Sequence, residues 1–212
     1  MAKISYLHQH PDIAQGLEKL LRDDKIFSKL GFKPEEMLWK KRTANFQAFM
    51  STIISQQISI KAAASIFKKL HDRMDGNIHP AGFMELTDLD LREVGLSNGK
   101  IKYGRGLADA ILSGAFSPAR LRHMDDEAVI NEIVKLQGFG VWSAQMFLIF
   151  GLARPDVWPV GDLGIQIGAQ YYLRLEEKAD LATLTKLGQK WKGNRTAASL
   201  ILWHMSNNKI RI

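Results

Sequence analysis

The segment from Leu136 to Ala144, which reads LQGFGVWSA, combines residue types that can bind an anion without a charged side chain. Apolar spacing predicts a helix on each side, the second beginning at about Val141, with Gly138 and Gly140 in the turn between them. Glycine permits positive φ at both positions and lets the backbone approach another surface closely. The second helix adds unpaired N–H groups and the positive end of its dipole. The pattern predicts a phosphate site; the alternative is a helix–helix corner that uses glycine as a C-cap.

A second candidate for chemistry is Asp162, in the Gly- and Pro-containing segment VWPVGDLGI. It precedes a helical run, and capping a helix N-terminus is the commonest role of an aspartate in that position. A carboxylate held in a dry cleft can instead stabilise positive charge that develops on a reacting atom. Both roles are open at this point.

The elements that must position these residues have helical spacing almost throughout. Phe46, Phe49, Met50, Ile53 and Ile54 form a wide apolar stripe. No segment shows convincing apolar–polar alternation, so we expect an all-α fold with short connections. Further helices are expected over Ala62–Leu70, Asp88–Val94, Lys100–Ser113, Asp125–Leu136, Val141–Gly151, Leu163–Leu173, Leu181–Trp191 and Arg195–Asn207.

The composition limits the partners of such a fold. The chain has 212 residues, 29 Lys and Arg against 22 Asp and Glu, a net charge of +7 and no cysteine. The basic balance favours a polyanion such as nucleic acid. The absence of cysteine excludes disulfides, thiolate zinc sites and cysteine-ligated iron–sulfur clusters. No apolar run is long enough to span a bilayer, and the N-terminus lacks the apolar region of a signal peptide, so we expect no membrane association.

The spacing Leu136-x-Gly138-x-Gly140-x-x-x-Ala144, between two helices, resembles the helix-hairpin-helix DNA-binding motif. Followed by the single Asp162, it resembles the HhH-GPD superfamily of base-excision DNA glycosylases. Within that superfamily the chain is most similar to the 3-methyladenine DNA glycosylase II (AlkA-like) group.

Three further segments carry the resemblance. Phe46 to Ala62 is similar to the family's first helix and its Q-x-x-S element, and Leu91 to Lys100 to the segment that leads into its DNA-inserting loop. Trp191 to Trp203 is similar to its W-x-P-x-R-S-x-A…W element. Two positions depart from the family pattern. Gly193 stands where proline is usual, and Asn98 falls where a bulky wedge is common.

The resemblance implies the HhH-GPD fold, with two packed helical lobes and a cleft between them. One lobe is expected to hold about residues 1–45 plus 156–212, and the other about residues 46–155. Asp162 would begin the helix that crosses the cleft. The implied reaction is hydrolysis of the N-glycosidic bond of alkylated purines, first 3-methyladenine, with 7-methylguanine and 1-methyladenine as further substrates.

One carboxylate suits this reaction, because breaking the bond develops an oxocarbenium-like charge on the sugar that Asp162 can stabilise. An alkylated purine is already cationic, so its departure needs little protonation. Family members that also cleave the backbone use a lysine two residues after the second hairpin glycine. Trp142 occupies that position here, so we expect no lyase activity.

The resemblance assigns DNA contacts to the hairpin and to a second loop. These residues are Gln137, Gly138, Phe139, Gly140, Val141 and Ser143 in the hairpin and Ser97, Asn98 and Lys100 in the loop, which could equally be a solvent-exposed turn. The carbonyls of Val134, Leu136 and Phe139 would hold a structural Na⁺ or K⁺ when DNA is bound; no other cofactor is expected.

A flipped base needs an aromatic pocket, because an electron-poor alkylated purine stacks well on electron-rich rings. Trp142, Trp203 and Trp158 are expected there, with the alternative that they are core aromatics. Gln57 falls in the middle of the stripe that begins at Phe46, with Gln56 at its edge. A polar group in that place is hydrogen-bonded in the core or faces a cleft, and we expect the cleft for both glutamines.

The expected partner is double-stranded DNA that contains alkylated bases, bound by a monomer. The expected location is the cytoplasm, at the nucleoid, in a bacterium and the nucleus in a eukaryote. Three alternatives stay open: a non-catalytic DNA-binding module, a glycosylase for deaminated or mismatched bases, and a helical protein-interaction domain.

Overall fold

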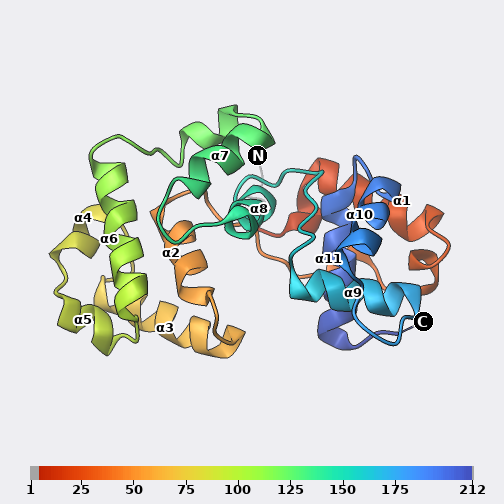
Figure 1. Ribbon diagram of the computed structural model, residues 1–212, viewed down its shortest axis with the longest axis horizontal. Coiled ribbons are helices and arrows are strands. Elements are labelled where there is room, and N and C mark those ends of the chain that lie inside the picture. Colours follow the sequence, from red (N-terminus) through yellow and green to blue (C-terminus); the bar gives the residue numbers. More distant parts are fainter. Residues whose placement is uncertain (1–4, 212) are drawn as a thin grey trace. The chain divides into compact units, whose positions relative to one another are not determined.

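The computed structural model describes residues 5–211, and their regular structure is helical (Figure 1). A single isolated bridge joins Tyr6 and Lys40, and no strand occurs within this range. The all-α prediction is confirmed. None of the helices in the described range is long and apolar enough to cross a bilayer.

The α-helices are short to medium in length. They are α1 Pro11–Asp23, α2 Phe46–Ser55, α3 Ile60–Arg73, α4 Pro80–Glu85, α5 Asp88–Glu93, α6 Asn98–Leu112, α7 Asp126–Val134, α8 Val141–Phe150, α9 Leu163–Leu173, α10 Leu181–Lys190 and α11 Arg195–Asn208.

Local sequence explains most of the helix starts. The side chains of Asn45, Ser59, Thr87, Asp125 and Asp180 each accept a hydrogen bond from a backbone N–H in the first turn of the helix that follows. Each such cap contributes about 1 kcal/mol. By contrast α1 and α4, which the apolar spacing did not predict, begin with proline, whose fixed φ suits the first helical position.

The chain divides into two compact units. Unit 1 comprises Met1–Arg42 and Leu148–Ile212, and unit 2 comprises Thr43–Phe147. The boundaries expected from the sequence, at about residues 45 and 155, lie somewhat further along the chain than these. The second boundary falls inside α8, so this helix contributes residues to both units.

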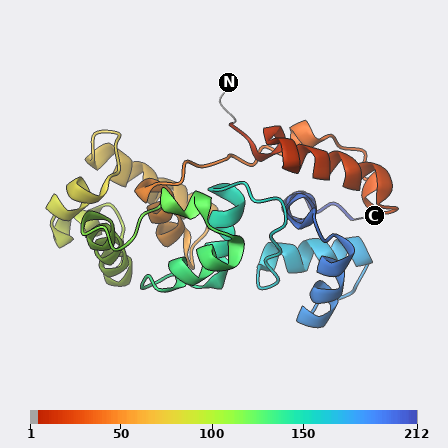
Figure 2. The same cartoon turned by 90° about the horizontal axis from the view of Figure 1, so that it is seen from above.

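Unit 1 is built around α11, which is buried over most of its length. Figure 2 shows α11 end-on, with α1 on one side and α9 and α10 on the other. The crossing with α9 is close, because a Cβ at Gly168 would lie 2.3 Å from the carbonyl oxygen of Leu202. This contact explains why the middle of α9 carries a glycine.

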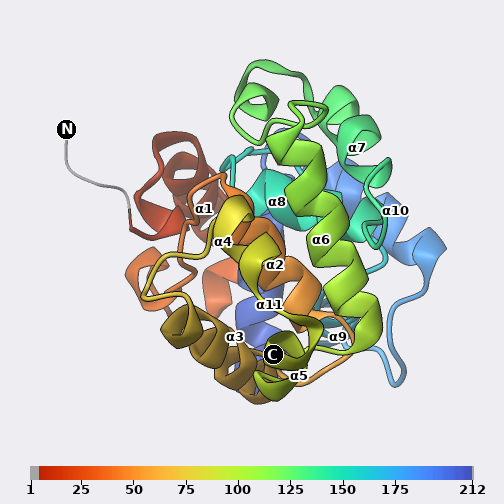
Figure 3. The same ribbon diagram turned by 90° about the vertical axis from the view of Figure 1, so that its left-hand side faces the viewer.

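Unit 2 is built around α2, which packs against α3 and α6 (Figure 3). Phe49 on α2 lies at the centre of an aromatic cluster. Its ring centroid is 5.4 Å from that of Phe116, 5.5 Å from that of Phe139 and 4.4 Å from that of Phe147. The predicted apolar stripe of α2 therefore forms the core against which the turn after α7 is held.

Candidate functional site

The turn between α7 and α8 lies in unit 2, where the sequence predicts a hairpin. Gly138 has φ +88°, and a Cβ there would lie 2.4 Å from the ring of Tyr103, so only glycine fits this position. Gly140 differs: it does not have positive φ, and a Cβ there would meet no atom within 4 Å. Of the two glycines that permit positive φ, only Gly138 therefore uses it, and the missing side chain of Gly140 leaves open space at the α8 N-terminus.

A side chain from α2 supports the turn. The amide nitrogen Nε2 of Gln56 donates a 2.8 Å hydrogen bond to the carbonyl oxygen of Gly138. Gln56 is half-buried and caps the C-terminus of α2, so the bond joins two elements far apart in the chain. This bond gives Gln56 a role in holding the hairpin, and its place in the base pocket stays a prediction.

Gln57 is also not where the apolar stripe predicts it. Helix α2 ends at Ser55, and Gln57 is an exposed residue with φ 58°, in the left-handed region. The prediction that it lies in the middle of the stripe is wrong, because the stripe stops before the helical spacing reaches it. An aliphatic or aromatic side chain would be strained in this conformation.

The residues of the hairpin divide into buried and exposed groups. Phe139 is 7% exposed and Ser143 is 4% exposed, so the side chains of these two predicted DNA contacts lie in the core and only their backbone groups are candidates. Gln137 and Gly140 are exposed, and Val141 and Trp142 are 54% and 37% exposed. The surface of the turn is therefore uncharged and is made of backbone groups, the amide of Gln137 and apolar side chains.

The second predicted loop begins α6. Ser97 caps this helix, with its Oγ accepting a 3.4 Å bond from the N–H of Lys100, and Asn98 is exposed beside it. The ammonium of Lys100 donates a 2.7 Å bond to the carbonyl of Ile54 near the end of α2. Burial lowers the pKa of Lys100. One N–H of the Lys100 ammonium thus helps to close the end of α2, and the contact of Lys100 with a DNA phosphate stays a prediction.

Asp162 lies in unit 1, at the start of α9. Its Oδ1 accepts a 3.0 Å hydrogen bond from the N–H of Ile165, which is the helix cap that the sequence offers as an alternative role. The same oxygen accepts a 2.7 Å bond from the indole Nε1 of Trp203 on α11. The carboxylate is partly exposed and is held by two donors, so capping and chemistry are compatible in this position.

Trp203 belongs to an aromatic group within unit 1. Its ring is stacked on Phe150, with centroids 5.7 Å apart, and tilted by 54° against Trp39 at 5.8 Å. The guanidinium of Arg42 lies 5.7 Å from the centroid of Phe150. The sequence pattern does not single out Trp39 or Phe150, because Trp39 lies in an aperiodic segment and Phe150 fits the apolar pattern of α8.

Trp158 is a core residue. It is 8% exposed, its indole N–H donates to the carbonyl of Leu184, and a Cβ at Gly188 would lie 2.5 Å from its ring. Its ring also meets Trp191 edge-on at 5.5 Å. The predicted base-pocket role is corrected to the core alternative, because the ring and the N–H are both used inside unit 1.

The loop that carries Asp162 is tied to the start of α11. The carboxylate of Asp156 accepts bonds from the N–H groups of Gly193 and Arg195 and from the guanidinium of Arg195. Burial would raise the pKa of Asp156, but these bonds outweigh it and lower the pKa. Thr196 adds a bond from its hydroxyl to the carbonyl of Arg154 and accepts one from the N–H of Val157. These contacts fix the segment that leads to Asp162.

The same geometry explains one departure from the family pattern. Gly193 has φ +87° and donates its N–H to Asp156. Proline has φ near −65° and no N–H, so it cannot take this place. The glycine is required by the local backbone.

The described residues include no cluster of His, Asp or Glu that could hold a metal ion. In unit 1, Asp162 combines a carboxylate with neighbouring aromatic rings, an arrangement that stabilises positive charge. In unit 2, the hairpin offers backbone N–H groups at a helix N-terminus, an arrangement that binds an anion.

The hairpin and Asp162 both fall within the segment that a known protein family matches. The HhH-GPD superfamily of base excision DNA repair proteins matches residues 50–193. YfjP of Bacillus subtilis is 30% identical over 165 residues, which cover 74% of this chain and 58% of that protein. DNA-3-methyladenine glycosylase 1 of Schizosaccharomyces pombe is 30% identical over 179 residues, which cover 82% of this chain and 77% of that protein.

Solved structures with the same fold have related names. The 3-methyladenine DNA glycosylase of Schizosaccharomyces pombe, in complex with abasic DNA, matches with a TM-score of 0.79 and 26% identity over 91% of this chain and 97% of that chain. A DNA-3-methyladenine glycosidase of Bacillus halodurans matches with a TM-score of 0.72 and 29% identity over 95% and 92%. The chain described here belongs to the HhH-GPD superfamily of base excision DNA repair proteins.

Proposed function

We propose that the chain is a monofunctional DNA-3-methyladenine glycosylase, which hydrolyses the N-glycosidic bond of alkylated purines in duplex DNA. The observation that carries the proposal is the carboxylate of Asp162, held by Ile165 and Trp203 beside an aromatic group. The names of the relatives and of the solved structures support the same substrate class. We expect 3-methyladenine as the main substrate, with 7-methylguanine and 1-methyladenine as further ones.

In this mechanism Asp162 acts on the sugar of a flipped nucleotide. As the bond to the base breaks, positive charge develops on the deoxyribose, and the carboxylate stabilises it or orients the attacking water. The leaving base is already cationic, so a separate general acid is not required. Trp142 stands at the position of the Schiff-base lysine, so water is the nucleophile and the backbone stays intact.

Aromatic faces would receive the base. Trp142 is 37% exposed at the start of α8, and Trp39 and Phe150 are partly exposed in unit 1. An alkylated purine carries positive charge, and such a ring is attracted to the electron-rich faces of tryptophan and phenylalanine. This preference would separate alkylated purines from the neutral bases that make up undamaged DNA.

The hairpin would hold a phosphate of the bound duplex. We expect the N–H groups at the start of α8 to face the open space that Gly140 leaves. The carbonyls of Val134, Leu136 and Phe139 are hard oxygen donors, which suit a monovalent cation. The carbonyl of Leu136 also accepts a 3.1 Å bond from the N–H of Phe139, which leaves it a second lone pair. A bound Na⁺ or K⁺ would there help to neutralise the phosphate.

The partner in this proposal is double-stranded DNA with alkylated bases, bound by a monomer. Such an enzyme works where the genome lies, in the cytoplasm at the nucleoid of a bacterium or in the nucleus of a eukaryote.

Replacement of Asp162 by asparagine tests the reaction directly. Asparagine keeps an oxygen that can accept from Ile165 and Trp203 but loses the negative charge. We expect release of 3-methyladenine from methylated duplex DNA to fall by at least about 100-fold, while binding to undamaged duplex is kept. The measurement is chromatography of the released bases, which also reports the range of lesions.

Asp180→Asn is the matched control. Asp180 caps α10 in unit 1 as Asp162 caps α9, and it accepts a 2.8 Å bond from the N–H of Thr183. We expect Asp180→Asn to release bases at the parent rate. Release at the parent rate by Asp162→Asn would show that the catalytic assignment is wrong. A parent chain that binds duplex DNA and releases no base would favour the non-catalytic module.

A further inference from the structure

We propose that Trp203 is a positioning residue, which orients the carboxylate of Asp162 through its indole N–H rather than receiving the flipped base on its ring. The inference rests on the proposed function, in which Asp162 stabilises the charge on the sugar. It differs from the base-pocket role that the family resemblance implies for this tryptophan.

The first observation is the hydrogen bonding of Oδ1. A helix cap needs only the bond from the N–H of Ile165, at 3.0 Å. The bond from Trp203 Nε1 is shorter, at 2.7 Å, and comes from a different helix. Two donors that converge on one oxygen from α9 and α11 fix both the rotation and the plane of the carboxylate. A charged acceptor makes such bonds roughly twice as strong as neutral ones.

The second observation is the burial of the indole. Trp203 is 7% exposed, and Phe150 and Trp39 pack against its ring. A ring covered in this way has little free face on which a purine could stack. Trp39 and Phe150 are the members of this group that are partly exposed. In unit 1 the stacking role therefore passes to them, and Trp203 contributes its N–H.

The third observation is the residue that lets the indole approach. A Cβ at Gly164 would lie 2.7 Å from Cδ1 of Trp203, 3.0 Å from its Nε1 and 3.1 Å from Oδ1 of Asp162. Any side chain there would press on both the donor and the acceptor of this bond. Gly164 does not have positive φ, so its reason to be glycine is this contact and not the backbone conformation.

Two substitutions break the contact in different ways. Trp203→Phe removes the N–H and keeps an aromatic ring, and Gly164→Ala keeps both partners and pushes them apart. We expect each to lower the single-turnover rate of 3-methyladenine release by about 10- to 100-fold, because a small displacement of a catalytic group costs that much. The affinity for duplex DNA with an abasic site should change by less than about threefold, since no DNA-binding group is altered.

Gly161→Ala is the matched control for Gly164→Ala. It makes the same change in the same segment, and a Cβ at Gly161 would meet no atom within 4 Å. We expect it to keep the parent rate. Parent rates in both Trp203→Phe and Gly164→Ala would overturn the proposal, as would a loss of abasic-site binding equal to the loss of rate.

A spectroscopic readout separates this inference from the proposed function. The indole N–H of Trp203 should resonate downfield among the five tryptophans, and its signal should move upfield in Asp162→Ala, which removes the acceptor. Trp203→Phe assigns the signal. If none of the five indole signals moves upfield in Asp162→Ala, the proposal is overturned even if Trp203→Phe fails to fold. A parent chain that releases no alkylated base would refute the proposed function and leave this result standing.

Discussion

At the scale of single residues, two of the aspartates in unit 1, Asp162 and Asp24, have different surroundings. Asp162 is partly exposed at the start of a helix, whereas Asp24 is 6% exposed. Asp24 accepts bonds from the N–H groups of Ile26 and Phe27, the hydroxyl of Tyr172 and the indole of Trp191, and it pairs with Lys190 at 2.7 Å. Both carboxylate oxygens of Asp24 are therefore used to hold segments of unit 1 together. The sequence does not single out Asp24, because its partners come from distant segments.

The surroundings of Asp24 predict a loss of stability in acid. Burial would raise the pKa of Asp24, but the bonds from Lys190, Ile26, Phe27 and Trp191 outweigh it and lower the pKa from 3.8 to about 2. As the pH falls, the carboxylate of Asp24 is therefore protonated in the unfolded chain before it is protonated in the folded chain. The contribution of Asp24 is fully present above about pH 4 and is lost as the pH falls through 2. It amounts to about 2 kcal/mol.

Urea unfolding of the parent and of Asp24→Asn between pH 5 and pH 2 checks this prediction. The free energy of unfolding of the parent should fall more steeply over this interval, so that the gap between the two proteins narrows. A gap that stays constant across the interval would contradict it.

At the scale of elements, the α7–α8 turn predicts different outcomes for its two glycines. Gly138→Ala should destabilise the chain by about 1–3 kcal/mol, because alanine at φ +88° is strained and its Cβ would collide with Tyr103. Gly140→Val should leave the melting temperature almost unchanged, because the space is open. It should nevertheless weaken binding to every duplex sequence, because the valine side chain blocks the approach of a phosphate.

Thermal melting and fluorescence anisotropy with undamaged duplex separate these effects. Gly106→Val, at an exposed position of α6 outside the predicted DNA contacts, adds a side chain that also meets open space and controls for bulk alone. Unimpaired DNA binding by Gly140→Val would rule out the phosphate grip at this turn.

Most helices of the fold could be predicted from local sequence. The spacing and the cap of Leu163–Leu173 predicted α9 with the observed bounds, and the start of α8 was placed correctly at Val141. Prediction failed where no local period extends, as at Gln57, where the chain turns into the left-handed region after α2. Where a helix ends depends on which side chains donate hydrogen bonds to its last carbonyl groups. In α2 the ammonium of Lys100 donates to the carbonyl of Ile54.

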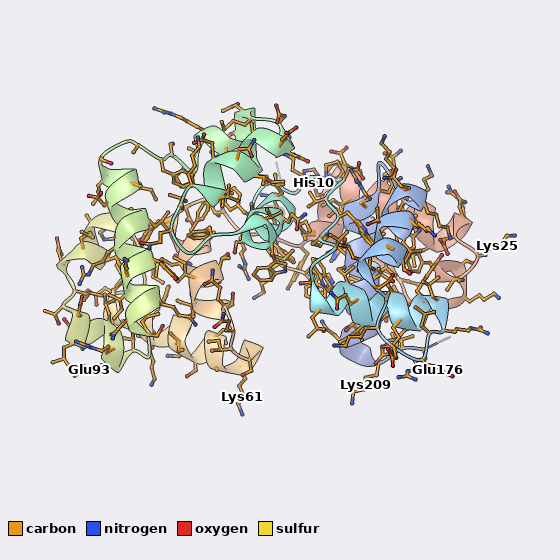
Figure 4. The ribbon with its side chains drawn as sticks, viewed as in Figure 1. His10, Lys25, Lys61, Glu93, Glu176 and Lys209 are labelled. Carbon is orange, nitrogen blue, oxygen red and sulfur yellow. The ribbon has the colours of Figure 1, made fainter. Side chains whose placement is uncertain are left out.

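At the scale of the whole molecule, the net charge of +7 comes from lysines and arginines that are spread over the surface. Lys25 and Lys209 in unit 1 and Lys61 in unit 2 point outwards (Figure 4). Several basic side chains are paired within the fold, as Arg105 is with Asp88 at 2.7 Å and Arg195 with Asp156. We therefore expect the attraction to DNA to be a general property of the surface, with specific docking at the uncharged hairpin.

The separate roles expected for the basic surface and the uncharged hairpin predict how the affinity for duplex DNA depends on salt. Affinity for undamaged duplex should fall by at least about tenfold between 50 and 200 mM salt, because the lysines and arginines release counterions from the phosphates. Gly140→Val should bind more weakly at every salt concentration with a reduced slope, since the docked arrangement brings the basic surface to the duplex. Titration of fluorescent duplex at several salt concentrations checks this. Affinity of the parent that does not change with salt would contradict it.

The sequence by itself determined the helical class, most helix starts and the glycine hairpin, because apolar spacing, capping side chains and turn residues act over a few neighbouring positions. The tertiary structure decided which side chains meet. Gln56 reaches a carbonyl 82 positions away and Trp203 reaches Asp162 across 41 positions. No local period encodes such pairs, since they depend on how helices pack. The sequence therefore singled out Asp162 and Trp203 separately, and only the fold showed that the indole of Trp203 donates to the carboxylate of Asp162.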